Sequence, residues 1–193
     1  KRLVAAWAVD DHTVSAAYQA VKLGIVDATL VGDADMIAKV CEEEKLDASV
    51  FQIVDVKEEL KAISTAVDMI NNKEGDILMK GLCSTDKYMR AILKKEGGLL
   101  PPKAVLSHVA VLESPFYHKL MIISDMAVIP APDLKQKEAI TKYVVNTAKA
   151  LQIEKPKVAF IAATEQMLAG MPACVDAAIL AKMVDRGQIP GCV

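Results

Sequence analysis

Residues 77–93 read Ile-Leu-Met-Lys-Gly-Leu-Cys-Ser-Thr-Asp-Lys-Tyr-Met-Arg-Ala-Ile-Leu, and the rest of the chain can be interpreted from this segment. Its apolar start predicts a short buried strand that ends at Lys80-Gly81. Ser84 and Thr85 then supply the hydroxyl groups that commonly begin a helix, and apolar residues return at helical spacing. A strand, a glycine turn and a hydroxyl-led helix in this order are typical of an α/β protein.

Such a turn is also a candidate anion site. The first N–H groups of a helix lack intrahelical partners, and the helix dipole adds positive potential at the same place. Lys80 and Arg90 add two cations nearby, so we expect a phosphorylated or carboxylated ligand. The alternative is an ordinary turn, with Lys80 as a solvated charge and Arg90 in a surface ion pair. Neither the P-loop nor the G-x-G-x-x-G nucleotide motif occurs.

The composition excludes several classes of protein. The chain has 193 residues, of which 53% are hydrophobic, enough for a sizeable core. Its net charge of −2 argues against a nucleic acid or an anionic membrane as partner. No apolar stretch is long and clean enough to cross a bilayer. The cysteines and histidines lack metal-type spacing, so we expect no metal, free thiols and a cytoplasmic location.

Four strand–helix units fill the first half of the chain and predict a parallel, doubly wound sheet. The third helix should turn four apolar side chains inward. The expected strands before residue 77 are Leu3–Val9, Ala28–Val31 and Val50–Val54; the helices are Thr13–Leu23, Ala34–Glu44 and Lys57–Asn71; the inward side chains are Leu60, Ile63, Val67 and Ile70.

Paired glycines and prolines in 96–103 interrupt this rhythm and predict a subdomain boundary. We expect residues 1–103 to form one α/β subdomain and residues 104–193 to begin a second, within a longer protein. The elements expected after the boundary are an antiparallel strand pair, Val105–Leu112 with Leu120–Ser124; a long helix led by Asp133; a strand, Lys157–Ala163; a helix, Pro172–Met183, with a stop at Gly187; and a further strand from Ile189.

Several polar residues of this second half have two possible interpretations. Ser107 and His108 lie inside an expected apolar strand, where a histidine is more often a structural residue than a catalyst. Asp125 ends the next strand and could cap an element or face a cleft. Asp176 and Asp185-Arg186 could serve helix ends and ion pairs instead of a substrate.

Five motifs share their order and spacing with one known family. They are Met79-Lys-Gly-Leu-Cys-Ser-Thr85, Leu106-Ser-His-Val-Ala-Val111, Ala131-Pro-Asp-Leu134, Ile153-Glu-Lys-Pro-Lys-Val158 and the segment from Met171 to Ile189. With them the chain resembles the phosphate acetyl/butyryltransferase family, and most of all its butyryltransferase branch.

The resemblance implies a reaction and an architecture. The reaction is acyl-CoA plus phosphate giving acyl phosphate plus CoA, with a short acyl group, with coenzyme A as a substrate and no tightly bound cofactor. The implied fold is similar to isocitrate and isopropylmalate dehydrogenases, with two three-layer α/β subdomains that face a cleft. A homodimer or higher homo-oligomer, formed through the second subdomain, is expected. In the family a C-terminal segment returns to complete the first subdomain and carries the acid that accepts the CoA thiol proton; its counterpart would lie beyond Val193.

The resemblance also assigns roles to individual residues. Thr85 and Arg90 match a threonine and an arginine of the family's catalytic site, where they would hold and neutralise the phosphoryl oxygens. The expected substrate-binding residues are Lys80, Gly81, Ser84, Ser107, His108 and Asp125. Two alternatives stay open: a non-catalytic module that binds CoA or an anion or serves dimerisation, and a dehydrogenase of the related fold, which the missing glycine motif disfavours.

Overall fold

Strand β1 (Arg2–Ala6) is one of the two inner strands of the sheet in the first half of the chain, with a hydrogen-bonded neighbour on each side. The structure is a computed structural model that describes all 193 residues. The chain divides into two compact units, Lys1–Ala104 and Val105–Val193, which are described separately.

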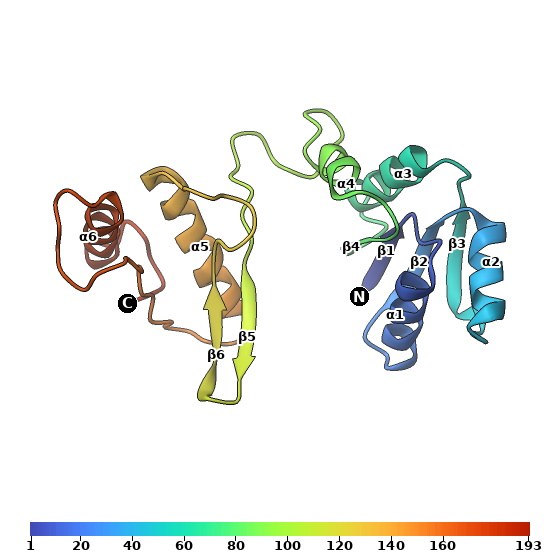
Figure 1. Ribbon diagram of the computed structural model, residues 1–193, viewed down its shortest axis with the longest axis horizontal. Helices are drawn as coiled ribbons and strands as arrows, with labels where there is room; N and C mark the ends of the chain where they lie inside the picture. The colour runs from blue at the N-terminus through green and yellow to red at the C-terminus, as the bar shows by residue number, and fades with distance from the viewer. The chain divides into compact units, whose positions relative to one another are not determined.

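In the first unit, four strands form one parallel sheet with the order β3-β2-β1-β4, and helices alternate with them along the chain (Figure 1). The predicted parallel α/β fold is therefore confirmed. After β1 the elements of this unit are α1 (Asp11–Lys22), β2 (Asp27–Gly32), α2 (Ala34–Glu43), the short 3₁₀ helix η1 (Ala48–Val50), β3 (Phe51–Asp55), α3 (Glu59–Asn71), β4 (Ile77–Lys80) and α4 (Thr85–Ile92).

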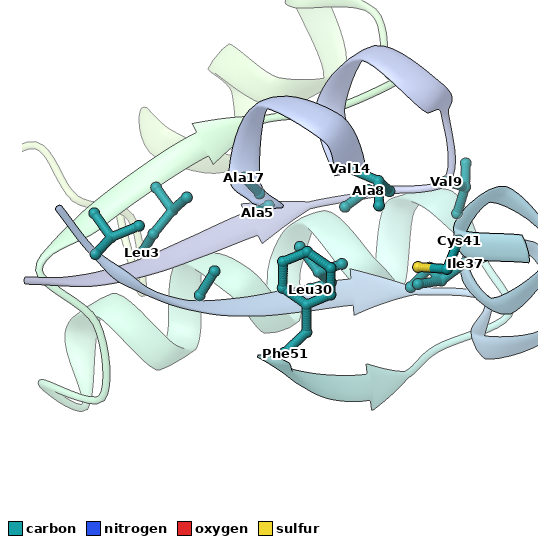
Figure 2. Packing of buried hydrophobic residues seen from close by; sticks show 12 residues of the cluster. Leu3, Ala5, Ala8, Val9, Val14, Ala17, Leu30, Ile37, Cys41 and Phe51 are labelled. Atoms are coloured by element: carbon teal, nitrogen blue, oxygen red, sulfur yellow. The ribbon is translucent and has the colours of Figure 1, made fainter. Parts of the chain in front are cut away.

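Helices cover both faces of this sheet because successive strand side chains point to opposite sides. On one face, Leu3 and Ala5 pack with Val14 of α1 and Ile37 of α2 (Figure 2). On the other face the cluster joins β1 and β2 to α3 and includes Val4, Ala6, Val31, Ala62, Ile63 and Ala66. The small side chains of Ala5 and Ala6 at the end of β1 pack on opposite faces of the sheet, against the helices that cover each face.

Capping contacts and a left-handed glycine define the ends of α1. Asp10 caps α1 by accepting from the N–H of Thr13, and Gly24 adopts the left-handed conformation directly after it, at a φ of 69°. One predicted inward residue was wrong. Leu60 is 63% exposed, because the buried face of α3 is centred on Ala62 and Ile63.

The second unit contains a β-hairpin and two helices. Strands β5 (Ala110–Ser114) and β6 (Tyr117–Ile123) pair antiparallel, as predicted, but β5 starts later than expected and leaves Ser107 and His108 outside the ladder. Helix α5 (Leu134–Ala150) begins with a capping box in which Asp133 and Gln136 bond each other's backbone N–H. Helix α6 (Pro172–Asp185) ends before Gly187 at a φ of 74°, the predicted stop.

Two predicted strands of this unit are wrong. Residues 157–163 alternate in exposure but form no strand ladder. The N–H of Val158 donates to the carbonyl of Val193, and the N–H of Val193 donates to the carbonyl of Pro156. Ile189 does not begin a strand but is buried at 1% exposure among the side chains that pack with Val145 and Leu180. Neither segment pairs with a neighbouring strand in a sheet, and an apolar pattern alone does not make a strand.

Candidate functional site

The carboxyl ends of β1 and β4 form a topological switch point. These strands are neighbours in the sheet, but β1 leads into α1 on one face while β4 leads into α4 on the other. The two connecting loops therefore diverge, and in open α/β sheets ligands bind in the crevice that this divergence leaves. The structure places Lys80, Gly81, Ser84 and Thr85 at this edge.

Gly81 joins the two strand ends. Its N–H donates to the carbonyl of Ala6 at 2.9 Å, and the N–H of Leu82 donates to the carbonyl of Trp7 at 3.0 Å. A Cβ atom on Gly81 would lie 2.3 Å from the carbonyl oxygen of Trp7, so no larger residue fits without moving the backbone. The glycine is thus required by the close approach of two loops, and we keep its proposed contact with substrate as a prediction.

The start of α4 offers unpaired donors. Ser84 is the N-cap residue and accepts from the N–H of Lys87 at 3.3 Å. The N–H groups of Thr85 and Asp86 make no hydrogen bond, and the side chains of Ser84 and Thr85 are exposed. Two free N–H groups, a helix dipole and the threonine hydroxyl suit an anionic oxygen.

Contacts on the opposite side of α4 fix its position. The Tyr88 hydroxyl donates to the carbonyl of Leu78 at 3.2 Å, and burial raises the pKa of Tyr88 to about 12. Lys87 forms an ion pair with Glu59 of α3. These contacts hold the first turn of the helix beside the strand ends.

The two cationic side chains at this edge of the sheet differ in whether an acidic residue already pairs with them. Lys80 is exposed and forms no ion pair. The side chain of Arg90 is 80% exposed, and its Nε pairs with Asp86 at 3.1 Å, one turn back on the same helix. The surface ion pair is thus what the structure shows, and the role of Arg90 toward an anion stays a prediction. Such an exposed pair is worth only about 0.3–0.5 kcal/mol, so it does not lock the side chain.

Cys83 lies in the same loop but is not a reactive thiol. It is buried, and burial raises its pKa, which nearby Lys80 only partly opposes. A protonated, enclosed thiol is a packing residue.

The second unit brings together the other three predicted residues. The Ser107 hydroxyl donates to Oδ2 of Asp125 at 3.0 Å, and the N–H of His108 donates to the same oxygen at 3.2 Å. Burial acts to raise the pKa of Asp125, but hydrogen bonds from Val128, Ala127, His108 and Ser107 outweigh it and hold the pKa well below its usual range. The carboxylate is therefore ionised. Nδ1 of His108 is enclosed and has no hydrogen-bond partner.

Our sequence interpretation missed one member of this cluster. The Ser124 hydroxyl donates to the carbonyl of His108 and lies 3.2 Å from the Ser107 hydroxyl. The only signal was its position directly before Asp125 at the end of an apolar run.

The acidic residues of α6 serve the fold. Asp176 forms an ion pair with Lys137 at 2.6 Å and so joins α6 to α5, and Asp185 pairs with Lys182 on its own helix. These contacts fit the structural interpretation of both residues. Across the chain no three His, Cys, Asp or Glu side chains are grouped as metal ligands, and no helix is long and apolar enough to cross a membrane.

Comparison with known proteins identifies the family. The family model described as phosphate acetyl/butaryl transferase matches residues 57–193. The chain belongs to the phosphate acetyl/butyryltransferase family. This family includes the phosphate butyryltransferase of Clostridium acetobutylicum, 42% identical over all 193 residues, and the phosphate acetyltransferase of Thermotoga maritima, 36% identical over the same span. The chain covers 64% and 65% of these two proteins, respectively.

A solved structure shows the same fold. The branched-chain phosphotransacylase from Enterococcus faecalis V583 superposes with a TM-score of 0.83 at 23% identity, covering 100% of this chain and 66% of that one. The family resemblance read from the five motifs is thus confirmed, and this family fold includes the parallel sheet described above.

Proposed function

We propose that this chain contributes to an acyltransferase that moves a short acyl group, butyryl or acetyl, between coenzyme A and inorganic phosphate. The match of all 193 residues to a relative named phosphate butyryltransferase carries the proposal. The strand ends of β1 and β4 support it, because they offer what a phosphate-using enzyme needs at an anion site. The other features of the proposal follow from this assignment.

In the proposed site, phosphoryl oxygens bind at the start of α4. The free N–H groups of Thr85 and Asp86 and the Thr85 hydroxyl donate to them, while Lys80 compensates their charge. Gly81 allows the close backbone approach, and Ser84 holds the helix start in shape. Donors placed before the reaction begins stabilise the charge that develops on the oxygens in the transition state.

Arg90 is the proposed second cation, and it must leave Asp86 to act. Thr85 and Arg90 are five residues apart, about 140° around an ideal helix, so the long side chain has to reach back. Breaking the exposed pair costs about 0.5 kcal/mol, whereas a hydrogen bond to a charged group is worth about 1.5–3 kcal/mol. The balance favours the phosphoryl group whenever it is within reach.

The wider architecture is part of the same proposal. We propose two α/β subdomains of the isocitrate dehydrogenase type that face a cleft, in a homodimer or higher homo-oligomer formed through residues 105–193. The hairpin tip supports such an interface, because Phe116 is 95% exposed and Tyr117 and Leu120 are each 47% exposed. Four free cysteines suit a reducing cytoplasm. Sedimentation velocity that gives the mass of a monomer would contradict the assembly.

The test is phosphate-dependent release of CoA from butyryl-CoA and from acetyl-CoA by the full chain as the cell makes it. Arg90→Ala should lower the rate at least tenfold. Lys39→Ala is a matched control, since Lys39 is 74% exposed and also pairs with an acid one turn away. An unchanged rate in Arg90→Ala removes this residue from the site. Binding of phosphate and CoA without any turnover would favour the non-catalytic module.

A further inference from the structure

The carboxylate of Asp125 has no capacity left for a substrate. Its Oδ2 accepts from the Ser107 hydroxyl and the His108 N–H, and its Oδ1 accepts from the N–H groups of Ala127 and Val128, both at 2.8 Å. A carboxylate offers about four acceptor positions, and these four donors fill them. No lysine or arginine pairs with Asp125, so hydrogen-bond dipoles alone stabilise its charge.

The protons of the two neighbouring serines can be assigned from their partners. Each hydroxyl has one proton. The Ser124 hydroxyl donates its proton to the carbonyl of His108. The Ser107 hydroxyl donates its proton to the Asp125 carboxylate, because this charged acceptor outcompetes the neutral hydroxyl oxygen of Ser124. The two hydroxyl oxygens therefore lie 3.2 Å apart with no proton between them, and each keeps lone pairs to accept a further hydrogen bond.

We infer that Asp125 is a positioning residue that turns Ser107 into a hydrogen-bond acceptor for an N–H donor of the coenzyme A arm. This inference rests on the proposed function. Of the two substrates in that reaction, phosphate is an anion and would approach a fixed carboxylate that withholds the Ser107 proton. In contrast, the pantetheine arm of coenzyme A is uncharged along its amide groups, and their N–H groups are hydrogen-bond donors. An amide N–H shared by Ser107 and Ser124 supplies the proton missing between their oxygens.

Two other roles are excluded by the same geometry. Asp125 is a poor general base, because its acceptor positions are filled and hydrogen bonding lowers its pKa. Ser107 is a poor nucleophile for the same reason, since activation requires a neighbour that removes its proton. The carboxylate therefore orients Ser107 and does not change its ionisation.

The experiment measures the two substrates separately in the acyl phosphate plus CoA direction, with the full chain. Losing one neutral hydrogen bond of about 1 kcal/mol corresponds to about a fivefold weaker affinity. Ser107→Ala should therefore raise the KM for CoA about fivefold and leave the KM for acyl phosphate within about twofold. Ser107→Thr keeps the hydroxyl and should restore the KM for CoA.

Asp125→Asn gives a second readout. Its amide group turns a donor toward at least one N–H or O–H that the carboxylate accepted, so the KM for CoA should rise as much as in Ser107→Ala or more. The double variant should be no worse than Asp125→Asn alone, because both changes act through one hydroxyl. The pH profile of kcat/KM should keep its shape.

Several outcomes would overturn the inference. A raised KM for acyl phosphate in Ser107→Ala would show that Ser107 serves the anion. Loss of the acidic limb of the pH profile in Asp125→Asn would show that Asp125 is a base. If Asp125→Asn does not fold, the two Ser107 variants decide alone. If the unmodified protein transfers no acyl group, the proposed function fails, and calorimetric titration with CoA still tests Ser107: an unchanged affinity in Ser107→Ala refutes the acceptor role.

Discussion

Replacing Gly81 by alanine should separate the strand ends at the proposed anion site. The new Cβ would lie 2.3 Å from the carbonyl oxygen of Trp7 and 2.7 Å from that of Ala6. Both atoms belong to the backbone, so neither can rotate away, and β4 must move from β1. That movement stretches the hydrogen bonds that Gly81 and Leu82 donate to these same carbonyls.

The size of the effect follows from these contacts. Overpacking costs about 1–3 kcal/mol, and the two hydrogen bonds contribute about 1 kcal/mol each. The strand separation that relieves the clash is also what lengthens the bonds, so the terms overlap and we expect about 2–4 kcal/mol in total. With a urea dependence of about 2 kcal/mol per molar, the unfolding midpoint should fall by about 1–2 M.

The assay is urea unfolding followed by the fluorescence of Trp7, which is the only tryptophan of the chain and adjoins the substitution. Gly24→Ala is a suitable control in the same unit, since nothing lies within 4 Å of its Cβ position and only its φ of 69° resists a side chain. That variant should lose about 1 kcal/mol. A midpoint for Gly81→Ala at or above that of Gly24→Ala would refute the close-approach argument.

Three further predictions concern the stability of the first unit. Ser84→Ala removes the cap of α4 and should destabilise that helix by about 1 kcal/mol, measured as faster amide hydrogen exchange in its first turn, whereas Ser84→Asp should retain protection. Ile63→Ala removes a core side chain that is 1% exposed and should cost about 2–5 kcal/mol in urea unfolding; a loss below about 1 kcal/mol would contradict tight packing. The hydrogen bonds of Arg2 hold the pKa of Asp76 well below its unfolded value of about 3.9, so their stabilisation is present above that pH and is lost as the pH falls through the folded-state pKa. Midpoints measured between about pH 5 and pH 2 should therefore decline less in Asp76→Asn, and an equal decline would argue against the linkage.

The fold of the first unit was predictable from local sequence because each of its elements carries its own signal. An apolar run followed by a helical pattern repeats four times, and capping side chains begin three of the four helices. A left-handed glycine directly follows only the first helix, at Gly24, and the sheet order places β1 between β2 and β4. The segment 157–163 carried an equally clear strand pattern but has no ladder. Alternation reports which side chains are buried, while a strand also needs a partner, which is information from elsewhere in the chain.

The candidate site was predictable to a smaller extent. The turn at Gly81 and the cap at Ser84 follow from residue type and order. The pairing of Arg90 with Asp86 was visible as an i, i+4 spacing, yet spacing alone could not decide between a carboxylate and a substrate oxygen as its partner. The role of Ser124 could not be predicted, because its proton assignment depends on a carbonyl 16 residues away in the sequence.

The four free cysteines are all buried, two in each unit: Cys41 and Cys83 in the first, Cys174 and Cys192 in the second. Alkylating reagents can therefore reach them only after local or global opening, and the labelling rate measures how often each unit opens. Mass spectrometry of labelled peptides would follow the two units independently in one sample. The labelling rates of these four native thiols therefore report the opening of each unit separately, without the introduction of engineered cysteines.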